Sequence, residues 1–384
     1  MTHKNAKLSP ETIASHAAGI IDEATGAVIA PVHLSSTYAR DAEYELRGGN
    51  IYARDGTPTC HQAETVLAEL EEAKAALLFN AGISAPLAVL ESLPLGAHVI
   101  APEKMYYAAL LWLQRQSAKG ILKLSTYRPA DADSLRAVIT PDTALVWVET
   151  PTNPTWAVTD IAAVAEIAHA NGALLMVDST TAPPCTTKAL KLGADLVFHS
   201  ATKYLNGHSD VVAGALCTNK DNDLWQDILK IRTLQGTVLP GFPAYLLMRG
   251  MRTLYVRWDK ACANALKIAQ HFAGHPLIEA VQYPGLPDDP GHAVARKQMT
   301  RGFGGMMSIR VKGGEVMAKN VARKTKVFLP ATSLGGVESL IEHRYTIEGP
   351  DFGTAANLLR LSIGIEDADD LIADLEQALN QANG

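Results

Sequence analysis

Residues 195–214, DLVFHSATKYLNGHSDVVAG, constrain the fold of this chain more than any other stretch. The apolar run 196–198 predicts a short buried strand that stops at His199. The polar turn that follows carries Ser200, Thr202 and Lys203. Two hydroxyls suit hydrogen bonds to a phosphate, and a lysine amine becomes a nucleophile where its surroundings lower its pKa. The alternative interpretation is a surface lysine in a Ser/Thr loop, which is the usual origin of a lone SxTK pattern.

A second apolar run, residues 173–177, ends at Asp178 and predicts another strand. A carboxylate and a lysine then lie at the ends of two strands of one sheet. Pyridoxal phosphate (PLP) chemistry needs this pair, because the amine attaches to the cofactor aldehyde and the anion keeps the pyridine nitrogen protonated as an electron sink. The pattern therefore favours a PLP site with Lys203 and Asp178 over a plain surface loop.

Five sequence blocks, in this order, are similar to those of one enzyme family. They are IYARDGTPT (51–59), ETPTNPT (149–155), HSATKYLNGHSD (199–210), SLGGVESL (333–340) and LLRLSIGIED (358–367). The chain resembles the Cys/Met-metabolism family of PLP enzymes, which includes cystathionine gamma-synthase, gamma-lyase and beta-lyase and methionine gamma-lyase. The resemblance implies an α/β protein of PLP fold type I, like aspartate aminotransferase. Its large domain has a parallel-rich sheet, and its C-terminal domain is a smaller α+β unit.

Periodicity predicts three parts. Residues 1–60 are rich in Gly, Pro, Ser and Thr without a sustained repeat, which indicates an extended arm. Strands alternate with helices through residues 61–245, as in a parallel sheet with helices on both faces. A long helical segment at residues 245–273, followed by further strands, indicates a C-terminal domain at 246–384. The resemblance implies that the arm reaches a neighbouring subunit of a homotetramer built from two dimers.

Composition limits the partners and the compartment. A net charge of −6 without a basic run argues against nucleic acid, and no apolar run reaches the roughly 18 residues of a membrane helix. The four cysteines are scattered without a CxxC pair, which indicates reduced thiols in a cytoplasm and no metal site. The start, MTHKNAKLSPET, lacks the apolar core of a signal peptide. We expect a cytoplasmic enzyme for a small amino-acid substrate.

The expected cofactor contacts lie where strands end. A strand, a glycine turn and a helix start around Gly82 would present backbone N–H groups to a phosphate. Ligands of parallel sheets collect at the carboxyl ends of the strands, and the residues predicted there are Gly82, Asn153, Asp178 and Lys203. The resemblance implies phosphate contacts from Gly82, Ile83, Ser200 and Thr202 and, across the subunit boundary, from Tyr52 and Arg54. It also implies that Tyr106 stacks on the cofactor ring and that Asn153 lies beside the ring hydroxyl.

The expected substrate contacts centre on Arg360. An arginine in an apolar strand is costly unless paired, so Arg360 meets either a structural carboxylate or an anionic ligand. The resemblance implies the substrate α-carboxylate, bound with the help of Asn153, and places Ser333 near Lys203. It implies that Lys203 moves protons and that Tyr106 serves as an acid. The expected reaction is elimination or replacement at a γ carbon that carries a heteroatom.

Several positions depart from the family pattern. The sequence Tyr-Ala-Ala at 107–109 lacks the cysteine of methionine gamma-lyases, Thr332 stands where a glutamate is usual, and HRYTIEGP (343–350) replaces HPASMTH. Asp55 follows Arg54, where beta-lyases can carry a second arginine. At about 4 Å a carboxylate there repels a distal anion by roughly 1 to 4 kcal/mol and attracts a cation.

These departures leave the substrate open. Asp55 and Thr332 suggest a substrate with a cationic end, such as canavanine, whose γ oxygen carries a guanidino group. Asp55 could instead only form a salt bridge within the arm. Cystathionine gamma-synthase and cystathionine beta-lyase activities remain alternatives, and a cofactor-binding protein without catalysis is a further one.

Overall fold

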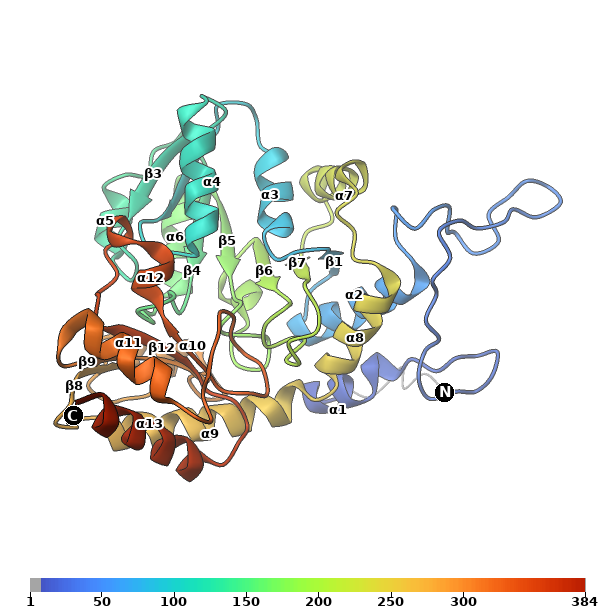
Figure 1. Ribbon diagram of the computed structural model, residues 1–384. Helices are drawn as coiled ribbons and strands as arrows, with labels where there is room; N and C mark the ends of the chain where they lie inside the picture. Colours follow the sequence, from blue (N-terminus) through green and yellow to red (C-terminus); the bar gives the residue numbers. More distant parts are fainter. Residues whose placement is uncertain (1–7, 384) are drawn as a thin grey trace. The chain divides into compact units, whose positions relative to one another are not determined.

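The computed structural model describes residues 8–383, which divide into two compact units. Unit 1 combines the chain up to Leu95 with Lys188–Tyr255, and unit 2 combines Gly96–Thr187 with the chain from Val256 onward. Figure 1 labels the elements of both units. The three-part division expected from the sequence stays a prediction.

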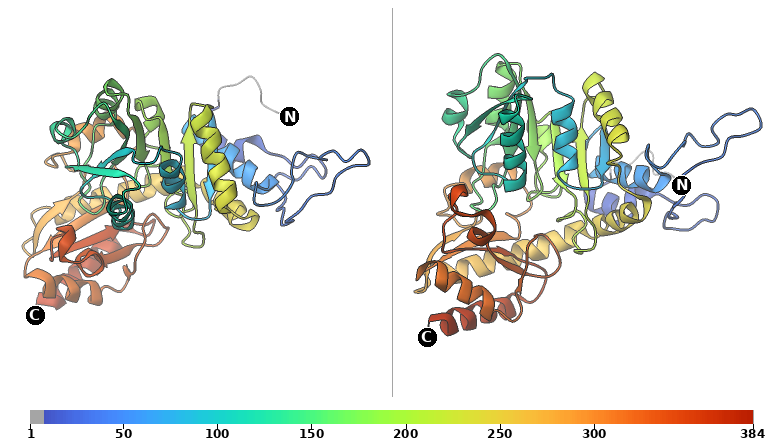
Figure 2. Two further views of the ribbon diagram at one scale, coloured as in Figure 1. Left: turned by 90° about the horizontal axis from the view of Figure 1, so that it is seen from above. Right: turned by 45° about the horizontal axis from the view of Figure 1, so that its top comes forward.

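Unit 1 begins with α1 (Pro10–Ser15) and η1 (Ala17–Gly19). Residues 20–57 then form an extended arm with only isolated strand bridges (Figure 2). The helices that follow are α2 (Pro58–Glu71), α3 (Ser84–Glu91), η2 (Ala189–Leu192), α7 (Asp223–Gln235) and α8 (Gly241–Met251). Thr57 caps α2 by accepting a hydrogen bond from the Cys60 N–H, and Pro58 suits the first helical position.

The strands of unit 1 are β1 (Ala75–Phe79), β6 (Leu196–Ser200) and β7 (Gly214–Thr218). β7 pairs antiparallel with both β1 and β6, and Gly214 lies opposite both Phe79 and Ser200. β6 runs one residue past the predicted end at His199, because His199 is buried against Glu71 and Ser200 still pairs with β7. The apolar run therefore predicts the strand, and the long-range pairing sets its end.

The first part of unit 2 is a parallel sheet, as predicted. Its strands are β2 (His98–Pro102), β3 (Lys123–Tyr127), β4 (Thr143–Glu149) and β5 (Leu174–Asp178), in the order β5–β4–β2–β3. The helices between them are α4 (Tyr107–Ala118), α5 (Ala132–Arg136) and α6 (Ile161–Ala170). Glu149 and Asp178 lie opposite each other at the carboxyl ends of β4 and β5.

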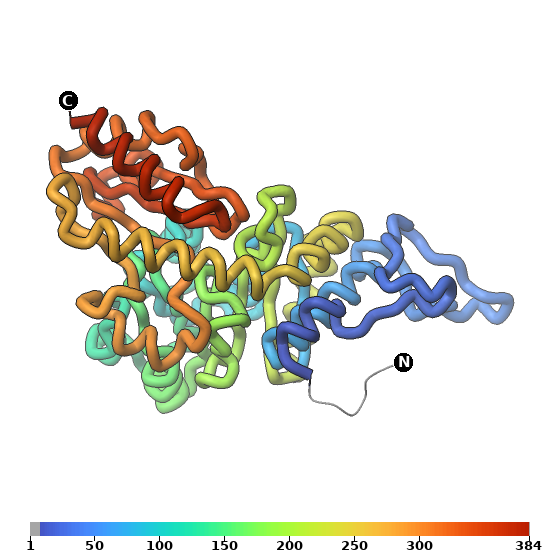
Figure 3. Tube along the Cα trace, turned by 90° about the horizontal axis from the view of Figure 1, so that it is seen from below, coloured from blue at the N-terminus to red at the C-terminus, as the bar shows by residue number. Residues whose placement is uncertain are grey.

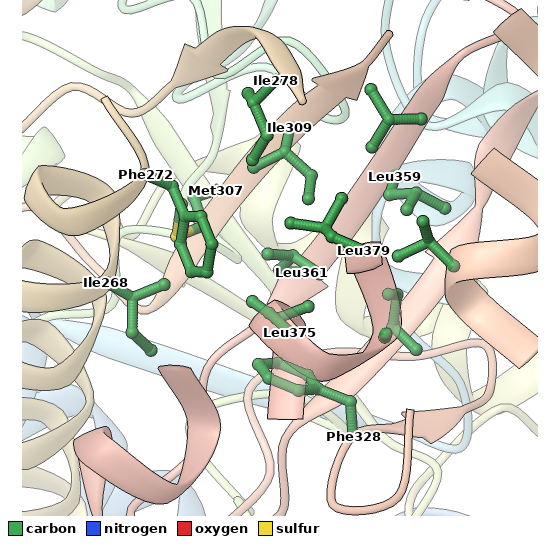
Figure 4. Packing of buried hydrophobic residues seen from close by; sticks show 14 of the residues in the cluster. Ile268, Phe272, Ile278, Met307, Ile309, Phe328, Leu359, Leu361, Leu375 and Leu379 are labelled. Carbon is green, nitrogen blue, oxygen red and sulfur yellow. The ribbon is translucent and has the colours of Figure 1, made fainter. Parts of the chain in front are cut away.

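The second part of unit 2 is a five-stranded sheet in the order β10–β11–β12–β9–β8. The strands are β8 (Ile278–Gln282), β9 (Met306–Val311), β10 (Leu329–Pro330), β11 (Leu340–His343) and β12 (Leu358–Ser362). The helical elements are α9 (Leu254–Phe272), α10 (His292–Gln298), α11 (Gly314–Lys324), α12 (Arg344–Glu348), η3 (Pro350–Phe352) and α13 (Ala368–Asn383). Apolar side chains from α9, α13 and the strands form its core (Figure 4).

Helices α9 and α13 run side by side along this part (Figure 3), joined by an ion pair from Lys267 to Asp369 and by a hydrogen bond between the His271 imidazole and Glu376. The single helical segment predicted for residues 245–273 is wrong, because α8 ends at Met251 and α9 begins at Leu254. Both the N–H and the hydroxyl of Thr253 bond to the Gly250 carbonyl, and this tight turn interrupts the helix.

Candidate active site

The Lys203 turn follows β6 and is held by its own backbone. The Lys203 N–H donates to the Ser200 carbonyl at 3.0 Å, and the Gly207 N–H donates to the Lys203 carbonyl at 2.7 Å. The Thr202 hydroxyl accepts from the Ala213 N–H at 2.9 Å and donates to the Ala213 carbonyl at 3.2 Å. These bonds fix the backbone from which the half-buried Lys203 side chain projects.

Ser200 lies against Gly82, in the turn between β1 and α3. A Cβ at Gly82 would lie only 2.6 Å from the Ser200 hydroxyl oxygen, so this approach requires glycine. Ile83 is the N-cap of α3, and no side chain caps the helix there. The site therefore combines helix N–H groups with a hydroxyl, which is a donor set that fits a phosphate.

The arm carries the other predicted phosphate ligands on its surface. Tyr52 is 45% exposed, and the Arg54 guanidinium lies 5.6 Å from its ring centre. The Asp55 carboxylate is exposed and has no ion-pair partner within the described chain, so the salt bridge considered for it is not found. Arg232, ion-paired with Glu64 at 2.5 Å, donates to the Asp55 carbonyl at 3.4 Å and ties this loop to a buried charge pair.

In unit 2, Asp178 ends β5 and is only 7% exposed. Its Oδ1 accepts the Thr180 N–H at 2.9 Å. A buried carboxylate at the carboxyl end of a parallel strand suits a protonated ring nitrogen, as the sequence predicts.

Glu149 lies beside Asp178 and was not predicted as a site residue. Its two carboxylate oxygens accept the N–H groups of Tyr106, at 2.6 Å, and of Asn153, at 2.9 Å. Burial and the Asp178 charge raise the pKa of Glu149 to about 8. The available signal was that LVWVE, like LLMVD, is an apolar strand that ends in an acid.

Tyr106 stands directly before α4 and is 44% exposed. Its ring meets that of Tyr107 edge to face at 5.6 Å. Partial burial raises the pKa of Tyr106, which keeps the hydroxyl protonated at neutral pH. An exposed, protonated phenol can both stack and donate a proton.

Arg360 brings two of the predicted substrate residues together. Its Nη1 donates to the Asn153 Oδ1 at 3.3 Å, and its Nη2 donates to the Ser333 carbonyl at 2.9 Å. Ser333 adopts a φ of 117°, which residues other than glycine rarely do. Burial lowers the pKa of Arg360 to about 10, so the guanidinium stays charged at neutral pH.

Arg360 also pairs with a structural carboxylate, which was one of the two partners expected from the sequence. Glu342 lies opposite it on β11 and pairs with its Nη2 at 2.5 Å. Glu342 also accepts from Arg344 at 2.9 Å and from the Thr332 hydroxyl at 2.5 Å, while Arg344 pairs with Glu348 at 2.5 Å. Although burial opposes ionisation, the Arg360 charge holds the pKa of Glu342 below its usual range.

The structure thus forms two groups of predicted residues. In unit 1, Gly82, Ile83 and Ser200 adjoin one another, with Thr202 and Lys203 in the next turn. In unit 2, Asn153, Ser333, Thr332 and Arg360 are linked directly or through Glu342. Within residues 8–383, no cluster of three or more metal-ligating side chains is present, and no helix could span a membrane.

Comparison with known proteins supplies the family. A model of the Cys/Met metabolism PLP-dependent enzymes matches residues 11–380. The chain belongs to this family. It is 45% identical to cystathionine gamma-synthase of Mycobacterium bovis over 96% of each protein. It is 40% identical to cystathionine gamma-lyase of Dictyostelium discoideum, covering 95% of this chain and 96% of the relative.

A solved structure has the same fold over almost the whole chain. Cystathionine gamma-synthase of Xanthomonas oryzae pv. oryzae in complex with cystathionine superposes with a TM-score of 0.94 at 38% identity, covering 98% of this chain and 99% of the other. The predicted family, the α/β fold type I class, the PLP cofactor and the PLP-dependent γ-elimination or γ-replacement class are confirmed. The individual site residues remain predictions.

Proposed function

We propose that this enzyme breaks a carbon–heteroatom bond at the γ carbon of an L-amino acid. The observation that carries the proposal is the buried Arg360, whose guanidinium contacts Asn153, the Ser333 carbonyl and Glu342. Such a guanidinium suits an α-carboxylate. Its family relatives named for cystathionine γ chemistry support the γ position. Analysis of the products, described at the end of the Discussion, tests this reaction.

The cofactor site would draw on the residues already described. The phosphate would be bound by backbone N–H groups at Gly82 and Ile83, by Ser200 and Thr202, and by the arm residues Tyr52 and Arg54 of a neighbouring subunit. Tyr106 would stack on the ring, Asn153 would adjoin the ring hydroxyl, and Asp178 would hold a proton on the ring nitrogen. When bound, PLP accepts the electron pair that remains when a proton leaves the substrate α carbon.

The protein's own side chains then move the protons. Arg360 fixes the substrate α-carboxylate, and the Lys203 amine removes the α proton. Lys203 next carries a proton from the β carbon, which γ departure requires. Tyr106, whose hydroxyl stays protonated at neutral pH, donates to the leaving heteroatom. Cysteine addition completes a synthase reaction, and water completes a lyase reaction.

The first candidate within this class is γ replacement, the cystathionine gamma-synthase reaction on an activated homoserine ester. Support comes from similarity over 96% of the chain to a protein of that name. Cystathionine beta-lyase chemistry, at the neighbouring carbon, is the alternative.

The second candidate is γ elimination from canavanine. The Asp55 carboxylate is exposed and free of ion pairs within the described chain, so it is available to a cationic substrate end. Thr332, in contrast, is bonded to Glu342. Asp55 would act beside Arg54, in the loop that Arg232 holds.

Replacing Asp55 by Asn should lower kcat/KM for canavanine relative to cystathionine by at least about fivefold, since a carboxylate contributes at least ~1 kcal/mol to such a charge contact. Steady-state kinetics on both substrates measure the ratio. Glu23→Gln, which also removes an exposed carboxylate from the arm, is the matched control and should leave it unchanged. If the ratio of the two kcat/KM values is unchanged in Asp55→Asn, Asp55 does not select canavanine.

We further propose a cytoplasmic homotetramer. Support comes from the exposed positions of Tyr52 and Arg54 on an extended arm, which suit contact with a neighbouring subunit. This arrangement requires at least a dimer for activity.

A further inference from the structure

Glu149 is a buried acid that the proposed mechanism does not use. It ends β4, is 5% exposed, and contacts two residues that the mechanism does use. Its Oε2 accepts the Tyr106 N–H at 2.6 Å, and its Oε1 accepts the Asn153 N–H at 2.9 Å. One carboxylate therefore joins the segment before α4 to the loop after β4.

This bridge needs two acceptor atoms at a fixed separation. Glutamine keeps the length of the side chain but has only one acceptor oxygen, so its amide N–H₂ would face a backbone N–H. Aspartate keeps both acceptors but is one methylene shorter and cannot hold both segments at their present distance. Among acidic and amide side chains, glutamate alone matches the observed geometry.

The same residue is in register with Asp178. Strands β4 and β5 are parallel, Glu149 lies opposite Asp178, and the Thr150 N–H donates to the Asp178 carbonyl at 3.4 Å. Burial raises the pKa of Glu149, and Asp178 on β5 and Glu348 on α12 raise it further. Burial and the Glu149 charge in turn raise the pKa of Tyr127 on β3. Glu149 thus holds the backbone of Tyr106 and of Asn153 next to the end of β5, where Asp178 lies.

We propose that Glu149 is a positioning residue, which sets Tyr106 and Asn153 in the places where they meet a cofactor held by Asp178. This inference rests on the proposed roles of those three residues. Glu149 itself touches neither the cofactor nor the substrate in this arrangement. Its loss should therefore change how the cofactor is held as well as how stable the protein is.

The test titrates cofactor-free protein with PLP and records the affinity and the absorbance spectrum of the bound cofactor across pH. The variants are Glu149→Gln and Glu149→Asp, with Glu103→Gln, an exposed glutamate three residues before Tyr106, as the matched control. Circular dichroism at the same temperature selects folded samples. Should Glu149→Gln not fold, Glu149→Asp, which keeps the carboxyl group, carries the test.

We expect both Glu149 variants to bind PLP about tenfold or more weakly, because leaving one buried N–H without its acceptor changes an equilibrium constant by roughly that much. The pH at which the bound cofactor's spectrum changes should also move, while Glu103→Gln matches the wild type. If Glu149 has only a structural role, its variants will have a lower melting temperature but the wild-type PLP affinity and spectrum. That result would overturn the inference.

Lys203→Ala separates this inference from the proposed function. It should lose the absorbance of lysine-bound cofactor whatever Glu149 does. If Lys203→Ala keeps the wild-type spectrum, the proposed function itself fails. If Lys203→Ala changes the spectrum while the Glu149 variants keep the wild-type affinity and spectrum, only the role of Glu149 fails.

Discussion

Replacing Lys203 by alanine should lower kcat by at least about a thousandfold on every substrate that the wild type accepts. The proposed mechanism assigns Lys203 both the attachment of the cofactor and two successive proton transfers. A single positioned base contributes roughly 100- to 10,000-fold, so losing two transfers and the attachment places the loss at the upper end. Single-turnover and steady-state assays with saturating PLP measure it.

Lys230→Ala is the matched control for this prediction. Lys230 is an exposed lysine on α7 of the same unit and has no part in the proposed site. It should retain wild-type turnover and the wild-type cofactor spectrum. Turnover by Lys203→Ala within tenfold of the wild type would show that another group performs the proton transfers.

Replacing Arg360 by glutamine should have two large effects, one on stability and one on activity. It leaves Glu342 without one of its two buried cationic partners, and breaking a buried ion pair costs about 3 to 5 kcal/mol. Because Arg344 still pairs with Glu342, we expect about 3 kcal/mol, measured by denaturant unfolding. The fall in kcat/KM should exceed about 100-fold, because the substrate carboxylate loses a charged contact.

Arg310→Gln supplies the comparison. Arg310 lies on β9 of the same sheet and forms an ion pair with Glu279, but both side chains are more than a third exposed. An exposed pair contributes roughly 0 to 1 kcal/mol, so this variant should be nearly as stable as the wild type and equally active. If Arg360→Gln were destabilised but kept the wild-type KM and kcat, Arg360 would have only the structural role.

Local patterns predict the strands that carry the site. Apolar runs followed by an acid, a glycine turn or a lysine turn predict the ends of these strands. Asp178 is the last residue of β5, and Gly82 and Lys203 lie three residues after β1 and β6. The pattern works here because a buried strand is an uninterrupted apolar run, and the first polar residue lies at or next to its end.

The partners of the site residues could not be predicted in the same way. Glu342 lies 18 residues before Arg360, and only the antiparallel register of β11 and β12 sets the two opposite each other. The Glu149 bridge depends on backbone N–H groups, which carry no sequence signal. The break between α8 and α9 likewise depends on a local hydrogen-bond pattern at Thr253 that helical periodicity does not show.

Two of the departures from the family pattern, HRYTIEGP and Thr332, contribute contacts around Glu342, and a third, Asp55, does not. HRYTIEGP supplies Arg344 and Glu348, which form the buried ion pairs beside Glu342. Thr332 contacts Glu342 and so connects to Arg360. Asp55 stays exposed, which keeps the canavanine hypothesis open to test.

The most direct measurement is mass spectrometry of the products that the PLP-loaded enzyme forms from cystathionine, from canavanine, and from an activated homoserine ester with and without cysteine. We expect chemistry at the γ carbon: 2-oxobutanoate from cystathionine, hydroxyguanidine from canavanine, or cystathionine from the ester only when cysteine is present. Pyruvate from cystathionine, with no product of γ cleavage or γ replacement from any substrate, would show that the bond breaks at the β carbon. That result would contradict the proposed γ-carbon reaction.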